Sequence, residues 1–155
     1  MSEKEMITGI EVPISFKYKY TAGSTTARFL MKMKEGKIVG QRCPSCSNVY
    51  IPPRGCCAKC GVVTKEEVEL PPIGVIESFT IVHLPIPGSP IEPPIISANI
   101  ILDGADIACM HLISEVDLDK VHIGMRVEAV WKPEEEWEYS FENIAWFRPI
   151  EKTND

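Results

Sequence analysis

Two Cys-x-x-Cys pairs that lie close together constrain the fold of this chain more than any other feature. Cys43 and Cys46 form the first pair, Cys57 and Cys60 form the second, and ten residues separate the pairs. Each pair forms a tight turn that points two sulfurs toward one place, and a hairpin of ten residues is long enough to bring the turns together. The spacing therefore predicts a rubredoxin-like ribbon that holds one metal ion per chain.

The donor set favours Zn²⁺ as that ion. Four thiolates are the usual ligands of a structural zinc, although the same four could hold iron in a rubredoxin-like redox centre, and this alternative stays open here. A closed site has no open position for water or substrate, so we expect the ion to hold the fold and not to catalyse. Only Cys57 keeps the two-residue spacing to Cys60, so we expect Cys56 to be a spare thiol.

The distribution of cysteines also indicates a compartment. Five of the six cysteines fall between Cys43 and Cys60, and such clustering in a reducing environment is typical of metal binding, not of disulfides. The first five residues include three charged ones, Glu3, Lys4 and Glu5, and no signal-peptide core follows them. The sequence has no run of about 18 apolar residues that could span a bilayer. We therefore expect a cytoplasmic protein with no membrane partner.

Pattern along the chain predicts a mainly β protein in four parts: an arm over 1–23, a helix and zinc ribbon over 24–70, a five-stranded OB-fold barrel over 71–150, and a tail over 151–155. Ser24 or Thr25 can cap the helix, whose residues Ala27, Leu30 and Met31 share one face with Phe29 and Met33 beside them, and Gly36 ends it. The ribbon strands are expected at 37–42 and 49–51. The barrel strands are expected at 75–84, 95–102, 107–113, 126–131 and 141–147, separated by Pro, Gly and Asp.

Charge divides the chain into two unlike parts. Residues 1–65 hold 11 Lys/Arg against 4 Asp/Glu, whereas residues 66–155 hold 5 against 18. An anionic ligand should therefore meet the first part, where Arg54 and then Lys59 are the candidates for contact with phosphate oxygens. A single-stranded nucleic-acid-binding OB/zinc-ribbon protein is the alternative binding module, but the barrel carries the wrong sign for it. We therefore expect no nucleic-acid partner.

The residues that could support catalysis are scattered. His83, His111 and His122 have no acid or nucleophile at motif distance, and Cys109 lies in an apolar strand. We therefore expect no activity from the chain alone. The connection over 84–94 is apolar and holds five prolines, which indicates either a preordered binding surface that displays Leu84, Ile86 and Ile91 or a loop folded over the barrel mouth.

Several motifs together resemble a known family. They are Gln41-Arg42-Cys43-Pro44-Ser45-Cys46, Ile51-Pro52-Pro53-Arg54, Cys57-Ala58-Lys59-Cys60-Gly61, Leu102-Asp103-Gly104 and Phe147-Arg148-Pro149. Over roughly residues 24–150 the chain is similar to the zinc-ribbon plus OB-fold acyl-CoA-associated family, formerly a domain of unknown function. Members accompany thiolase-fold enzymes, so the resemblance implies a hetero-oligomer in which this subunit docks on a thiolase-fold catalytic subunit and shares its CoA thioester. The pair Cys56-Cys57 departs from the family pattern, in which the residue before the third ligand is not cysteine.

Overall fold

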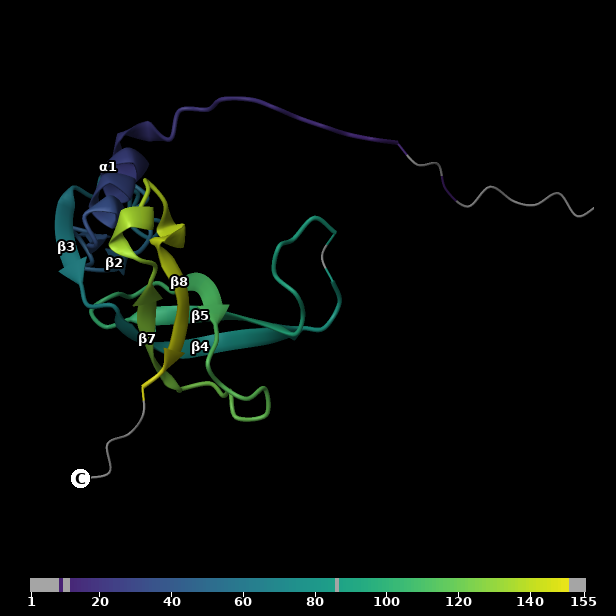
Figure 1. Ribbon diagram of the computed structural model, residues 1–155. Helices are drawn as coiled ribbons and strands as arrows, with labels where there is room; N and C mark the ends of the chain where they lie inside the picture. The colour runs from purple at the N-terminus through teal and green to yellow at the C-terminus, as the bar shows by residue number, and fades with distance from the viewer. Residues whose placement is uncertain (1–8, 10–11, 86, 151–155) are drawn as a thin grey trace, which may run out of the picture.

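The computed structural model describes residue 9 and residues 12–85 and 87–150. A single α-helix, a small three-stranded sheet and a closed five-stranded barrel make up these residues (Figure 1). The helix α1 spans Gly23–Lys34, and the small sheet contains β1 (Ile38–Arg42), β2 (Val49–Tyr50) and β3 (Glu66–Leu70) in the order β2-β1-β3. The mainly β class, with helix and ribbon ahead of an OB-type barrel, is confirmed.

The barrel closes in the order β4-β5-β6-β8-β7. Its strands are β4 (Ile73–Val82), β5 (Ile95–Leu102), β6 (Cys109–Ile113), β7 (Arg126–Trp131) and β8 (Ile144–Pro149). All neighbouring strands are antiparallel except β6 and β8, which are parallel and pair only at Ile113 and Phe147. This Greek-key closure is the arrangement of an OB fold.

Two barrel strands begin later than the pattern predicts. The run expected from residue 107 becomes a strand only at Cys109, and the run expected from residue 141 starts as a 3₁₀ turn, η2 (Phe141–Asn143). The Ser140 hydroxyl accepts a hydrogen bond from the N–H of Glu142 and so caps this turn. A second 3₁₀ turn, η1, spans Glu134–Glu136.

The predictions for the helix were wrong in two respects. Neither Ser24 nor Thr25 caps it, because α1 begins at Gly23 after Ala22, which offers no side-chain cap. The core-facing residues are Phe29 and Met33, whereas Met31 is 54% exposed. Residues four apart lie on one face of a helix, and the pair Phe29 and Met33 is the one directed at the barrel.

The ribbon and the barrel share one hydrophobic core. Phe29, Met33 and Ile38 belong to the same buried cluster as the barrel residues Ile100 and Phe147. Polar contacts reinforce this junction. The backbone N–H of Val49 donates to the carboxylate of Asp106, the N–H of Asp106 donates to the carbonyl of Val49, and the amide of Asn143 donates to the carbonyl of Met33. The two Cys-x-x-Cys turns are therefore held in a fixed position on the barrel.

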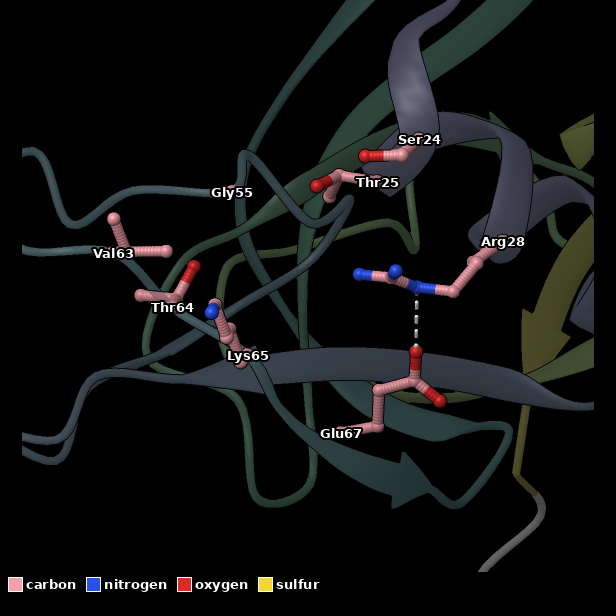
Figure 2. A pocket seen from close by; sticks show the side chains of 8 residues that line it. All are labelled: Ser24, Thr25, Arg28, Gly55, Val63, Thr64, Lys65 and Glu67. Atoms are coloured by element: carbon pink, nitrogen blue, oxygen red, sulfur yellow. Dashed lines mark ion pairs between the residues drawn. The ribbon is translucent and has the colours of Figure 1, made fainter.

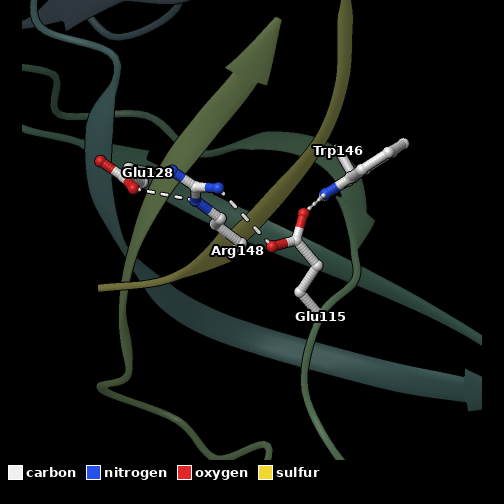
Figure 3. Close-up of polar contacts among 4 residues, drawn as sticks. All are labelled: Glu115, Glu128, Trp146 and Arg148. Atoms are coloured by element: carbon white, nitrogen blue, oxygen red, sulfur yellow. Dashed lines mark hydrogen bonds and ion pairs between the residues drawn. The ribbon is translucent and has the colours of Figure 1, made fainter. Parts of the chain in front are cut away.

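Ionic contacts link β7 and β8 to the loop that follows β6. The Arg148 guanidinium lies 2.9 Å from a Glu128 oxygen and 3.6 Å from a Glu115 oxygen, and the Trp146 indole N–H donates to Glu115 (Figure 3). These side-chain contacts add to the backbone pairing of β6 with β8, which is limited to Ile113 and Phe147. Side chains therefore fasten the barrel where its strand pairing is shortest.

Two segments extend from the body (Figure 1). The arm over residues 12–22 has no regular secondary structure and runs outward from α1, and the connection between β4 and β5 loops out from the barrel. Leu84 and Ile91 in that loop are exposed, so the described part of the loop does not fold over the barrel, and the predicted display of Ile86 lies outside the described residues. No helix among the described residues is long and apolar enough to cross a membrane.

Candidate metal centre

The two Cys-x-x-Cys turns meet in space. The sulfurs of Cys43, Cys46, Cys57 and Cys60 all lie within 4.8 Å of one another, and those of Cys46 and Cys57 are 3.7 Å apart. A tetrahedral Zn²⁺ with bonds of about 2.3 Å to sulfur requires sulfurs about 3.8 Å apart. The cluster therefore has the size and the donor set of a four-thiolate metal site.

The two turns have matching hydrogen bonds. The N–H of Ser47 donates to the carbonyl of Cys43 at 3.0 Å, and the N–H of Gly61 donates to the carbonyl of Cys57 at 2.9 Å. Ser47 and Gly61 both have φ in the left-handed region, +64° and +70°, which turns the chain back after each pair. The two turns, here called knuckles, thus have the same backbone conformation. This shared conformation explains why both cysteine pairs have the same two-residue spacing.

Backbone donors point at the sulfurs from within each knuckle. The N–H of Cys46 lies 3.4 Å from the sulfur of Cys43, and the N–H of Cys60 lies 3.3 Å from the sulfur of Cys57. Hydrogen bonds of this kind stabilise the thiolate over the thiol, which is the form that binds metal.

The hydroxyl of Tyr50 adds a donor that the sequence did not reveal. This hydroxyl lies 3.1 Å from the sulfur of Cys57, and both side chains are buried. The hydrogen bond with Tyr50 is the main reason that the pKa of Cys57 falls to about 6, against the opposing effect of burial. In the sequence, Tyr50 is simply a tyrosine between the two cysteine pairs. Its contact with the Cys57 sulfur arises only because β2 packs against the second knuckle.

The pKa of Cys46 shifts in the opposite direction to that of Cys57. The N–H of Asn48 lowers its pKa, but burial and contacts with the other three sulfurs outweigh that effect and raise the pKa to about 12. Four sulfurs this close cannot all be ionised unless a cation lies among them, because like charges repel. The electrostatics of the cluster therefore fit a bound metal cation.

Cys56 lies apart from the cluster. It is exposed, and its backbone forms an isolated bridge with Val63, while Cys57 is buried among the other sulfurs. The fold thus gathers the four cysteines that the spacing selects and directs the fifth to solvent.

The predicted phosphate-contacting residues lie at the surface beside this centre. Arg54 and Lys59 are both exposed, and neither forms an ion pair with another described residue. The Arg54 guanidinium lies 6.0 Å from the centre of the Tyr50 ring, at the outer limit of a cation–π contact. Arg42, by contrast, is paired with Glu66 at 3.1 Å.

A polar hollow of about 550 Å³ lies between α1 and the residues that flank the second Cys-x-x-Cys pair, Gly55 and Val63 to Glu67 (Figure 2). Arg28 and Lys65 point into it, but Arg28 already pairs with Glu67 at 3.2 Å. The sequence did not identify Arg28 and Lys65 as candidate anion-binding residues, because nothing in the local pattern distinguishes them from other surface residues.

The described residues do not assemble a catalytic group from the scattered histidines and Cys109. The thiol of Cys109 donates to the carbonyl of Ile100, and burial raises its pKa to about 11, so it stays protonated. The His111 ring packs against Phe141 and Phe147, and its Nδ1 accepts from the N–H of Leu112. The His122 ring lies 2.8 Å from the carbonyl of Lys120. Cys109, His111 and His122 are thus each engaged in a structural contact.

Comparison with known proteins places the chain in a family. Residues 33–63 match the model described as "ChsH2, rubredoxin-like zinc ribbon domain", and residues 67–132 match "ChsH2, C-terminal OB-fold domain". A DUF35 domain-containing scaffold protein of Methanocaldococcus jannaschii is 35% identical over 97 residues, which cover 61% of this chain and 67% of that protein. The chain belongs to the DUF35 family. The resemblance inferred from the motifs is confirmed.

Other similar proteins extend the comparison. A probable enoyl-CoA hydratase alpha subunit of Thermomonospora curvata is 32% identical over 98 residues, which cover 63% of this chain but only 30% of that protein. A solved chain of the Ltp2-ChsH2(DUF35) aldolase superposes with a TM-score of 0.63 at 27% identity, covering 84% of this chain and 98% of that one. A DUF35 protein of unknown function from Sulfolobus solfataricus shares the fold, with a TM-score of 0.61 at 20% identity over 82% of this chain and 84% of that one.

Proposed function

We propose that this chain is a non-catalytic, zinc-binding accessory subunit of a thiolase-like acyl-CoA-processing complex. It docks on the catalytic subunit and helps to organise the site of the CoA thioester. The observation that carries the proposal is the contrast within the described residues between a closed four-cysteine centre and the absence of any grouped nucleophile and base. The names of its relatives, a scaffold protein, a hydratase subunit and an aldolase component, support the same role.

Zinc is the metal that we assign to Cys43, Cys46, Cys57 and Cys60. Bound there, Zn²⁺ supplies folding free energy by crosslinking the two knuckles, because an unfolded chain has no preformed site. Metal analysis of the purified protein tests the assignment. We expect a colourless protein with about one zinc per chain, and a red protein with iron would support the rubredoxin-like alternative.

The relation to a thiolase-fold partner is the finer part of the proposal. Among thiolase partners, we propose the small subunit of benzoylsuccinyl-CoA thiolase as a parallel, on the basis of the Ile14–Tyr18 arm. We also propose that the chain divides into its parts after residues 23 and 70. A cytoplasmic location belongs to the same proposal, because a reducing compartment keeps the thiolate ligands from forming disulfides.

Arg54 and Lys59 are the residues proposed to contact CoA. CoA carries a diphosphate and a 3'-phosphate, an Arg fork suits phosphate oxygens, and Arg54 has no carboxylate partner among the described residues. The experiment is co-expression of Arg54→Ala with the catalytic subunit, with Arg28→Ala as the control because Arg28 is already paired with Glu67. Intact assembly with a raised KM for the CoA substrate supports phosphate contact. Loss of assembly assigns Arg54 to the interface, and unchanged values remove it from the site.

A further inference from the structure

The N-terminal arm carries a one-sided row of exposed apolar side chains. Large apolar residues occupy every second position from residue 12 to residue 20, and each is between 67% and 82% exposed; they are Val12, Ile14, Phe16, Tyr18 and Tyr20. In an extended chain, alternate side chains lie on one face, so these five form a continuous stripe, and Lys17 and Lys19 lie on the other face. A stripe of this size left in water marks a binding segment.

The barrel carries a groove with complementary chemistry. It has a volume of about 1430 Å³, above the range of roughly 300–1,000 Å³ for small-molecule sites, and it is lined mainly by apolar side chains of β5, β6, η2 and β8. Met110, Leu112, Phe141 and Trp146 are among them. A groove of this size and character suits a peptide segment better than a compact metabolite.

The rim of the groove is acidic. Five carboxylates line it and only one lysine, Lys132, does so; the carboxylates are Glu92, Glu115, Asp117, Asp119 and Glu142. Glu115 is paired with Arg148, and Asp117 with Lys120. The other three carboxylates form no ion pair with described residues, so the rim favours a cationic segment and repels an anionic ligand.

The floor of the groove includes a sheet edge. β6 pairs with β5 at five residue pairs but with β8 only at Ile113, so from Cys109 to Leu112 the side of β6 toward β8 makes no strand pairing in the described chain, and on this stretch the N–H of Leu112 donates to the His111 ring. Met110, in the middle of this stretch, is 70% exposed. An extended peptide can add to such an edge and place alternate side chains in a neighbouring pocket.

We propose that residues 12–20 of one copy bind in this groove of a second copy, extended along β6, and that the exchange of arms is reciprocal. The apolar stripe then covers the floor of the groove. The flexible stems of Lys17 and Lys19 let their ammonium groups reach the acidic rim. A reciprocal exchange satisfies both grooves at once and closes a two-fold dimer. The arm leaves α1 and runs away from its own barrel, which presents it to another molecule (Figure 1).

The mass of the isolated full-length chain in solution tests this interaction, which does not depend on the proposed acyl-CoA role. Sedimentation equilibrium of the zinc-loaded protein should show a reversible change from 17.3 kDa to twice that mass. The double variant Phe16→Ser/Tyr18→Ser should raise the dimer Kd more than about tenfold, because each aromatic contributes a large buried area. These side chains are 82% and 77% exposed, so the variant leaves the fold of the monomer intact. Ile123→Ser, at an exposed apolar residue outside the groove, is the control and should leave the Kd unchanged.

A charge exchange identifies the contact surfaces. Lys17→Glu/Lys19→Glu should weaken the dimer, Glu92→Lys/Glu142→Lys should weaken it also, and a mixture of the two should restore an arm-to-groove contact in the heterodimer. A chain that stays monomeric at all concentrations, or a dimer that both variants leave unchanged, overturns the proposal. A monomer whose arm and β6 amides are nevertheless protected from hydrogen exchange also overturns it, because the arm would then occupy the groove of its own chain.

Discussion

Replacing Gly36 with alanine should destabilise the protein through two separable effects. Gly36 follows α1 with φ of +72°, a conformation that costs an L-residue about 1–2 kcal/mol. A Cβ at this position would also lie 2.7 Å from two ring carbons of Trp137. That indole must move, although its N–H donates to the carbonyl of Lys132 at 2.8 Å and its ring packs on Trp131.

The matched control is Gly124→Ala. Gly124 has φ of +88°, but a Cβ there would meet no atom within 4 Å, so this variant measures the backbone cost alone. Overpacking usually costs a further 1–3 kcal/mol, so Gly36→Ala should lose about 2–5 kcal/mol and Gly124→Ala about 1–2 kcal/mol. Urea denaturation of the metal-loaded proteins gives both values.

A third variant isolates the clash. In the Trp137→Leu background, Gly36→Ala should cost no more than Gly124→Ala does, because the ring atoms are gone. Equal losses for the two alanine variants in the wild-type background would refute the reasoning that the indole fixes the end of α1 against the barrel.

Three further predictions concern the core, the metal ligands and the pH dependence. Phe147→Ala should lower the free energy of unfolding by about 3–5 kcal/mol in denaturant titrations, because this fully buried ring lies at the only pairing of β6 with β8. Cys57→Ser should lose the metal, whereas Cys56→Ser should retain it, as measured by metal analysis of each purified variant. The Arg126 guanidinium lowers the pKa of Asp103, so this pair stabilises the fold above the unfolded value of about 3.9, and the stability is lost as pH falls through the folded pKa. Between pH 6 and pH 3, the wild type should therefore lose more stability than Asp103→Asn, as followed by thermal unfolding.

The sequence was most informative where spacing determines geometry. The two Cys-x-x-Cys pairs selected the four sulfurs that the fold gathers, because a knuckle has one backbone conformation and Cys57 alone keeps its spacing. The barrel was also predictable from short apolar runs separated by turn residues. A run of alternating apolar residues has few ways to bury one face, and closure into a barrel pairs most of the strand edges.

Features that depend on packing between distant segments were not predictable. The face of α1 that enters the core depends on the position of the barrel, so Met31 could not be told from Met33 by local pattern. The hydroxyl of Tyr50 reaches Cys57 only after the ribbon folds. Phenylalanine is common in strands, yet the Ser140 cap and the contact with Phe29 hold Phe141 in a 3₁₀ turn. Each of these outcomes depends on tertiary contacts that no short window of sequence contains.

The central claim, that this chain is an accessory subunit and not an enzyme, is tested most directly by reconstitution. Turnover of a CoA thioester should be measured with the zinc-loaded chain alone, with a candidate thiolase-fold catalytic subunit alone, and with both at matched concentrations. We expect no turnover by the chain alone and a co-eluting complex whose activity exceeds that of the thiolase-fold enzyme alone. Turnover by this chain at a rate comparable to that of the mixture, or a mixture that neither associates nor gains activity, would contradict the account.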